Sequence, residues 1–64
     1  MQTCFETTIA EMPITLEQAA NKTFRVTYWK QIKSDLNYRD AALELGACIM
    51  HALACEGKLD NSTD

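Results

Sequence analysis

A chain of 64 residues is long enough for a single domain, and a domain of this size buries only about 60% of the surface that its unfolded chain exposes. With 47% hydrophobic and 23% charged residues, the composition is that of a globular protein and excludes wholesale disorder. The net charge is −3, yet four of the six basic residues lie between residues 18 and 34, where no acidic residue occurs. A core this small predicts additional support, such as a second copy of the chain.

The start of the sequence, MQTCFETTIAEM, bears on cellular location. It has neither the basic beginning nor the long apolar stretch of a signal peptide, and no apolar run reaches the roughly 18 residues of a membrane span. We therefore expect a soluble cytoplasmic protein without membrane contact, in which the three cysteines stay reduced.

The first element is predicted over residues 4–12. Phe5, Ile9 and Met12 follow one another at i, i+4 and i+7, which places them on one face of a helix, although CFETTIA is also acceptable as a strand. A small polar residue followed three positions later by Glu, Gln or Asp is typical of a helix start. This signal occurs three times in the chain: Thr3 with Glu6, Thr15 with Gln18, and Asn37 with Asp40.

The middle of the chain allows two interpretations. LEQAANK favours a helix, and the drift of apolar positions beyond it predicts two short helices, over 16–22 and 24–34, with a bend near Lys22. The alternative is an α+β domain with a short strand over 23–29, because TFRVTYW is rich in β-forming residues and alternates its apolar side chains.

Residues 38–56 give the clearest signal. They are rich in Ala and Leu and contain almost no β-branched residues, and Gly57 stands where a C-cap glycine belongs. We expect a helix there, followed by a flexible polar tail over 57–64. The sequence thus predicts an all-α domain of three to four helices over residues 1–56, forming an intertwined or face-packed homodimer.

The predicted helix 38–56 is apolar on two opposite sides. One side consists of Tyr38, Ala41, Ala42, Leu45, Cys48, Ile49, Ala52, Leu53 and Cys55. The other side consists of Leu43, Ala47, Met50 and Ala54. A helix that is apolar nearly all round must be covered nearly all round, and two or three short helices cannot wrap it. The second side is therefore the predicted surface for a second copy or a protein partner.

Cys48, His51 and Cys55 raise the question of a metal site. On one helix Cys48 and Cys55 lie about 10.5 Å apart along the axis, which is too far for a disulfide or for two thiolates on one zinc ion. The cysteines are interpreted as small apolar packing residues. No metal, cofactor or catalytic residue is predicted, because no nucleophile–base pair, phosphate-binding loop or carboxylate pair can be identified, and the protein is not expected to be an enzyme.

The basic segment 22–33 supports a second hypothesis. Its cations are interleaved with Phe24, Tyr28 and Trp29, a mixture that can contact phosphates and stack on bases. The surrounding sequence, LEQAANKTFRVTYWKQI, resembles a helix-turn-helix motif, although it lacks a turn glycine. The residues expected to contact nucleic acid are Lys22, Arg25, Tyr28, Lys30 and Lys33.

Two function classes follow from the sequence. The first is a small non-enzymatic regulator or inhibitor that self-associates through helix 38–56 and binds another macromolecule. The alternative is a nucleic-acid-binding module that uses the basic segment 22–33.

Overall fold

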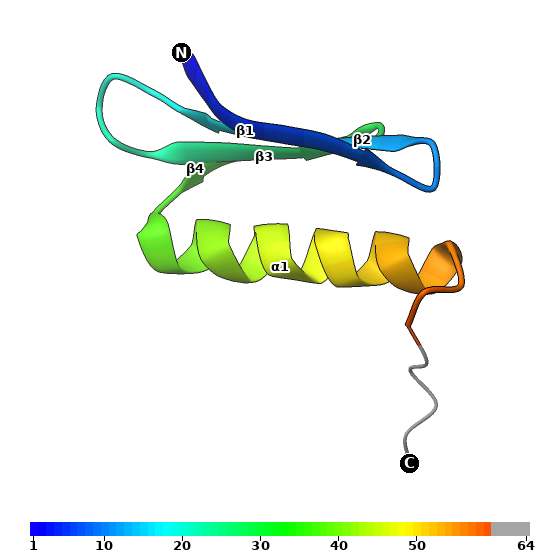
Figure 1. Cartoon of the computed structure of the whole chain (residues 1–64). Coiled ribbons are helices and arrows are strands. Elements are labelled where there is room, and N and C mark those ends of the chain that lie inside the picture. Colours follow the sequence, from blue (N-terminus) through cyan, green and yellow to red (C-terminus); the bar gives the residue numbers. More distant parts are fainter. Residues whose placement is uncertain (60–64) are drawn as a thin grey trace.

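The structure is a computed structural model that describes residues 1–59. Four antiparallel strands form one sheet in chain order, and one helix lies along one face of that sheet (Figure 1). The elements are β1 (Gln2–Ile9), β2 (Met12–Gln18), β3 (Phe24–Tyr28), β4 (Gln31–Leu36) and α1 (Tyr38–Cys55). The protein is a two-layer α+β domain, so the prediction of an all-α domain is wrong.

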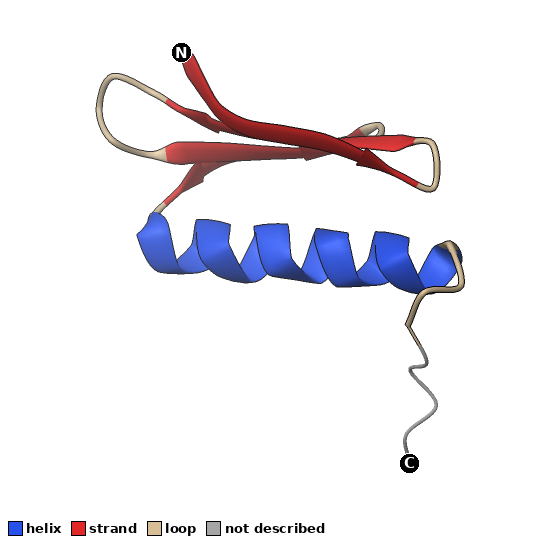
Figure 2. Cartoon of the chain, viewed as in Figure 1, coloured by secondary structure: helices blue, strands red, loops and turns tan. Residues whose placement is uncertain are grey.

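Most of the expected helices are strands (Figure 2). The segment 4–12 forms most of β1, while 16–22 and 24–34 are shared among β2, β3, β4 and the connections between them. The alternative strand over 23–29 does contain β3. The last five residues of the predicted polar tail, 60–64, lie outside the described residues.

The strands have one apolar face and one polar face. In β2 and β3 the buried Ile14 and Val26 point toward α1, whereas Glu17 and Arg25 are directly opposite each other on the other face. Alternation with a period of two is what a sheet covered on one side requires. The helix therefore covers the apolar face, and we call the uncovered side the outer face of the sheet.

The connection from β1 to β2 explains why the sheet was missed. Ile9 pairs with Met12, so Ala10 and Glu11 alone form the turn, with φ angles of 53° and 64°. A two-residue hairpin turn of this kind favours Asn-Gly because both positions need a positive φ. Neither Ala nor Glu signals such a turn. The β3–β4 turn is similar, since Trp29 takes a φ of 55° there.

Helix α1 begins and ends where the sequence predicts. The side-chain Oδ1 of Asn37 accepts a hydrogen bond from the backbone N–H of Asp40 at 2.7 Å, which satisfies one of the free donors of the first turn. At the other end Gly57 has a φ of 83°, and its N–H donates to the carbonyl of Ala54 at 3.1 Å. The next N–H, of Lys58, reaches back to the Leu53 carbonyl at 2.9 Å, which completes a Schellman motif.

The core lies between the sheet and the inner side of α1. Its buried residues are Ile14, Val26, Ala41, Cys48 and Ala52. Ile14 and Val26 are the largest of them, and the other apolar residues around them are only partly buried. Within residues 1–59 no helix combines the length and the apolar character needed to cross a membrane.

Candidate interaction surface

The outward side of α1 is an uncovered apolar surface. Leu43 and Met50 are 63% and 62% exposed. Gly46 and Ala47 are also exposed, and Ala54 is half-buried. We call these five residues the outer helix face. They include all four residues predicted to form the dimer or partner surface, and the helix places them on one side, away from the sheet.

Charge is nearly absent from the middle of this helix. Between Ala41 and Cys55 the only Asp, Glu, Lys or Arg is Glu44, and its carboxylate lies 3.6 Å from the ammonium group of Lys33 in β4. Glu44 is thus directed to the flank of the helix that faces β4. A solvent-facing helix side normally carries charged or polar residues. The outer helix face does not, which is typical of a surface that meets another apolar surface.

The sheet covers most of the other predicted apolar side of the helix, although Tyr38, Ala42 and Cys55 on that side are exposed. Ala41, Cys48 and Ala52 are buried against it, and Leu45 and Ile49 are partly buried. A second copy or a partner is therefore not needed to cover these residues, contrary to the expectation from the sequence. The protein's own sheet covers the centre of this side, whereas Leu43 and Met50 on the outer helix face remain exposed.

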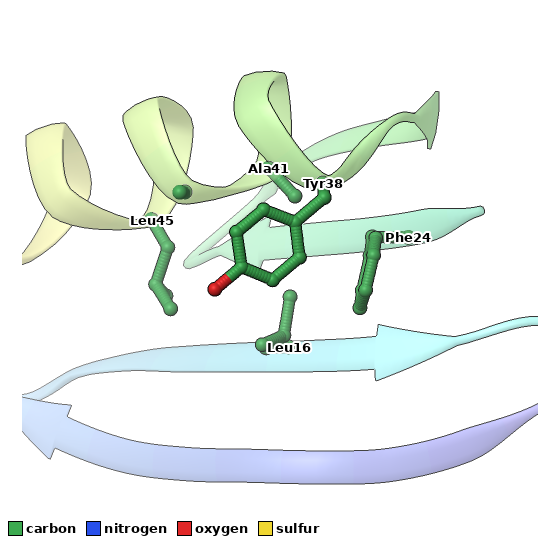
Figure 3. A pocket seen from close by; sticks show the side chains of 6 residues that line it. Leu16, Phe24, Tyr38, Ala41 and Leu45 are labelled. Atoms are coloured by element: carbon green, nitrogen blue, oxygen red, sulfur yellow. The ribbon is translucent and has the colours of Figure 1, made fainter. Parts of the chain in front are cut away.

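A small apolar cavity opens beside the N-terminal half of α1 (Figure 3). Its volume is about 180 Å³, and it is lined by Leu16, Phe24, Tyr38, Ala41, Ala42 and Leu45. The Phe24 and Tyr38 rings meet edge to face, with centroids 6.2 Å apart. Binding sites for cofactors or drug-sized ligands usually measure roughly 300 Å³ or more and contain a few convergent polar groups. This cavity fits a packing defect better than a ligand site.

The predicted nucleic-acid residues do not share one face. Lys22 lies in the β2–β3 loop and Lys30 in the β3–β4 turn, at opposite ends of β3. Tyr28 lies on the side of the sheet that faces α1, where its ring contacts His51 edge to face with centroids 6.0 Å apart. The aromatic ring of Trp29 lies under the Lys30 ammonium group, 4.9 Å from it.

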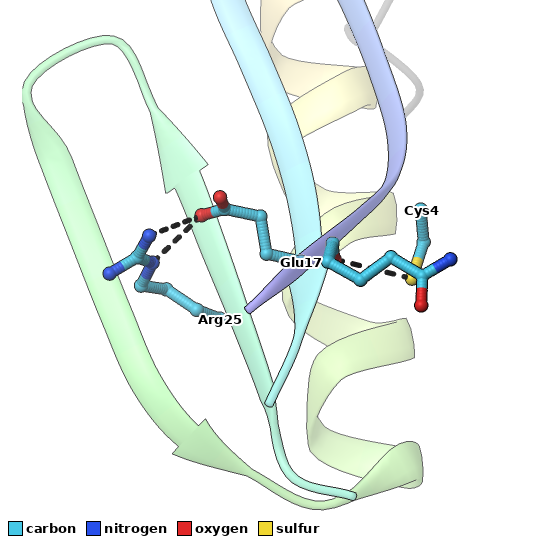
Figure 4. A network of polar contacts seen from close by, with 4 residues as sticks. Cys4, Glu17 and Arg25 are labelled. Atoms are coloured by element: carbon cyan, nitrogen blue, oxygen red, sulfur yellow. Dashed lines mark hydrogen bonds and ion pairs between the residues drawn. The ribbon is translucent and has the colours of Figure 1, made fainter. Parts of the chain in front are cut away.

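The other two cations of this segment contact carboxylates. On the outer face of the sheet the guanidinium of Arg25 donates from Nε and Nη2 to Oε1 of Glu17, at 2.8 and 2.6 Å (Figure 4). Lys33 points to the opposite side, toward Glu44. Because adjacent strand positions alternate between faces, cations that are close in sequence are separated in the fold.

The three cysteines and the histidine do not form one cluster. The Sγ of Cys55 is 3.6 Å from Nε2 of His51, one helical turn away. In the described part of the chain, no group of three or more His, Cys, Asp or Glu side chains is arranged to hold a metal ion.

Cys48 is buried and its thiol contacts Glu44 at 3.7 Å. Burial raises the pKa of Cys48, and the neighbouring Glu44 carboxylate raises it further, against a smaller opposing effect of Lys33. This thiol is thus held in its neutral, unreactive form. Its role agrees with the interpretation of Cys48 as a packing residue.

The sequence does not predict that the apolar side chains of Phe5 and Ile32 are exposed. Ile32 is 61% exposed on the outer face of the sheet, opposite Thr27, and Phe5 is 44% exposed on the helix-facing side of β1. The face that each of these side chains occupies follows from the alternation along its strand. It can therefore be predicted only when the strand itself is predicted.

Comparison with known proteins gives no relative for this chain. No family model, no curated protein and no solved structure matches it.

Proposed function

We propose that the protein is a non-enzymatic binding protein of the cytoplasm that pairs with a second copy of itself through the outer helix face. The observation that carries this proposal is the pair of well-exposed side chains, Leu43 and Met50, on a stretch of helix without outward charge. Exposed apolar patches of this kind mark interaction sites on small proteins. In the proposed assembly the paired surfaces present a second macromolecule with a composite binding site.

The residues of the outer helix face are complementary to themselves in an antiparallel arrangement. With the twofold axis between Cys48 and Ile49, Leu43 faces Ala54 of the second copy, and Ala47 faces Met50. Each contact then places a large side chain against a small one, as interdigitating helices require. A symmetric pair of this type is the commonest form of homo-oligomer.

Charge does not select the orientation of the helix pair. Arg39 and Asp40 lie in the first turn of α1, and Glu56 and Lys58 follow its last turn. With the axis between Cys48 and Ile49, Arg39 faces Lys58 of the second copy, and Asp40 lies near both Glu56 and Lys58 of that copy. The apolar contacts of the outer helix face, and not these water-exposed charges, therefore favour the antiparallel orientation.

The test is a change of charge on the outer helix face. Leu43→Glu with Met50→Glu places two carboxylates at the proposed contact without disturbing the core, because both positions are exposed in the single copy. We expect the mass of the assembly in sedimentation to fall by half while circular dichroism stays unchanged. An unchanged mass contradicts the proposal.

A matched control comes from the outer face of the sheet. Ile32 is as exposed as Leu43, so Ile32→Glu makes the same chemical change at another surface. Its mass should remain that of the unmodified protein. If the mass of the assembly fell with Ile32→Glu but not with Leu43→Glu and Met50→Glu, the outer face of the sheet would be the surface of self-association.

The alternative function, contact with nucleic acid, has weaker support because Arg25 and Lys33 contact carboxylates and Lys22 and Lys30 lie at opposite ends of β3. It predicts binding to duplex DNA that weakens with salt and is lost with Lys22→Glu and Lys30→Glu together. Titration of labelled duplex at low and moderate salt distinguishes the two functions. Absence of binding at low salt leaves the self-associating regulator or inhibitor.

A further inference from the structure

The two edges of the sheet differ in how they are protected. Edge strands expose unpaired backbone groups, and proteins shield them with bulges, Lys or Pro, and charges that point inward. Strand β4 has such features: Lys33 points to the helix-facing side, and the pairing with β3 is interrupted near Asp35, which has a φ of 58°. Strand β1 has eight residues without Lys, Arg or Pro, and its one irregularity lies near its start, between Thr3 and Phe5.

The hydrogen bonds of β2 identify the backbone groups of β1 that point away from the sheet. Thr8 is opposite Pro13, which has no N–H and whose carbonyl accepts instead from Trp29 on the other side at 2.8 Å. Thr8 therefore exchanges no ladder bond with β2. Alternate pairs of an antiparallel ladder behave alike, so Glu6, two residues before it, also directs its N–H and C=O outward.

We propose that β1 is a docking edge for β1 of a second copy, with the two strands antiparallel and the twofold axis at Thr7. The pairing joins the two sheets into one eight-stranded sheet. Both helices then lie on the same side of it, because the axis is perpendicular to the sheet. This contact goes beyond the pairing of outer helix faces and uses a different part of the molecule.

The residues of β1 select this register. With Thr7 at the axis, Glu6 faces Thr8 of the second copy, and their outward N–H and C=O groups are mutually satisfied. On the helix-facing side Phe5 faces Ile9, a favourable aromatic and β-branched pair. The half-exposed ring of Phe5 thereby gains a cover that its own chain does not supply.

Neighbouring registers are worse. An axis at Glu6 places two carboxylates directly opposite each other, which is destabilising. An axis at Thr8 pairs Glu6 with Ala10, but the N–H of Ala10 already donates to the carboxylate of Glu56 at 3.3 Å. Of these three registers, only the axis at Thr7 pairs the outward groups of Glu6 with those of Thr8 without placing like charges opposite each other.

The first test removes one outward donor. Thr8→Pro deletes an N–H that β2 does not use, and the matched control Thr8→Ala keeps it. In a background with Leu43→Glu and Met50→Glu, which breaks the helix contact, we expect a dimer with Thr8→Ala and a monomer with Thr8→Pro. A monomer in the Thr8→Ala protein overturns the β1 proposal and leaves the proposed function untouched.

The second test does not depend on how well the proline variant folds. Residues at the axis have Cα atoms about 4.5 Å apart in a pair without ladder bonds, within the range of a disulfide. In a protein with Cys4→Ser and Cys55→Ser, Thr7→Cys should form an intermolecular disulfide under mild oxidation. The control Glu6→Cys should not, because its two copies are offset by two residues and lie beyond about 7 Å.

The cross-linking result decides the register. A covalent dimer with Thr7→Cys, seen on a non-reducing gel and absent with Glu6→Cys, supports the axis at Thr7. Equal cross-linking of both, or none of either, overturns the proposal. Its outcome is independent of the outer helix face, because the cross-linked residue lies on the sheet.

Discussion

The backbone N–H of Ala10 donates to the Glu56 carboxylate at 3.3 Å, which joins the β1–β2 turn to the end of α1. The contact spans 46 positions of the chain and holds the C-terminal end of the helix over the sheet. It also uses a donor at the edge of β1 that would otherwise face water.

Replacing Glu56 tests this contact. We expect Glu56→Ala to lower the free energy of unfolding by about 1 kcal/mol, since a hydrogen bond to a charged group is lost at an exposed position. Glu56→Gln keeps an acceptor and should lose less. Urea denaturation of the two variants measures the difference, and equal losses would mean that the contact depends on packing rather than on the hydrogen bond.

The β1–β2 turn can be improved. Ala10 and Glu11 both adopt positive φ angles, which side chains other than Asn, Asp and Gly disfavour. Ala10→Asn with Glu11→Gly should raise the free energy of unfolding by about 1 kcal/mol, which shifts the Tm upward by several degrees. Thermal denaturation measures this shift. Ala10→Val, with a β-branched residue at the same position, should shift the Tm downward, and an upward shift would contradict the assigned turn.

Gly46 distinguishes the stability of one copy from the stability of the pair. A Cβ added there meets no atom within 4 Å, and Gly in an exposed helix interior is about 1 kcal/mol less favourable than Ala. In the Leu43→Glu and Met50→Glu background, Gly46→Ala should therefore stabilise the protein. On the intact outer helix face the same change should weaken self-association, because the added methyl group separates the helices. Sedimentation over a range of concentrations measures the association of the Gly46→Ala protein. Tighter association would mean that the α1 helices of the two copies do not approach each other at Gly46.

Alkaline pH should destabilise the fold. Burial raises the pKa of Cys48, and it raises the pKa of Tyr28, where the negative charge of a Cys55 or Cys48 thiolate adds to the effect. Above the ordinary thiol pKa of about 8.5, the unfolded chain has lost protons that the folded chain still holds. The contribution of these groups to the free energy of unfolding is thus undiminished below that pH. It is lost as the pH rises through the raised pKa values. Urea denaturation from pH 7 to 10 measures the slope, which Cys48→Ala should reduce; an equal slope in that variant would contradict the assignment.

Helix α1 could be predicted because its signals are local. Asn37 caps it, Gly57 ends it, and the residues between favour helix by propensity. Since the helical wheel follows from the helix itself, the outward position of Leu43 and Met50 was predicted as well. What covers the inner side could not be predicted, because that depends on the sheet.

The strands were missed because a spacing of four residues fits both periodicities. Phe5 and Ile9 share a helix face, but four is also an even number, so they share a face of β1 too. Met12 joins them after the two-residue turn, which reproduces the apparent i+7 position. The turns themselves contain Ala, Glu, Trp and Lys at positions where Asn or Gly would have been a recognisable signal.

The same error grouped the basic residues into one surface. In a helix the cations of segment 22–33 can gather on one side, whereas in strands Arg25 and Lys33 point to opposite faces. The carboxylate partners, Glu17 and Glu44, are 8 and 11 positions away in the chain, so no local pattern indicates them.

Each strand pairs with the strand that precedes it in the chain, and this order has a kinetic consequence. The loops between paired strands are short, so the strands of each hairpin are close together in the chain and the sheet should form quickly. The helix, however, is encoded after the sheet. During synthesis Ile14 and Val26 face water until residues 38–55 have left the ribosome, and in that interval the bare apolar side of the nascent sheet is the part of the molecule most exposed to chaperones and to aggregation.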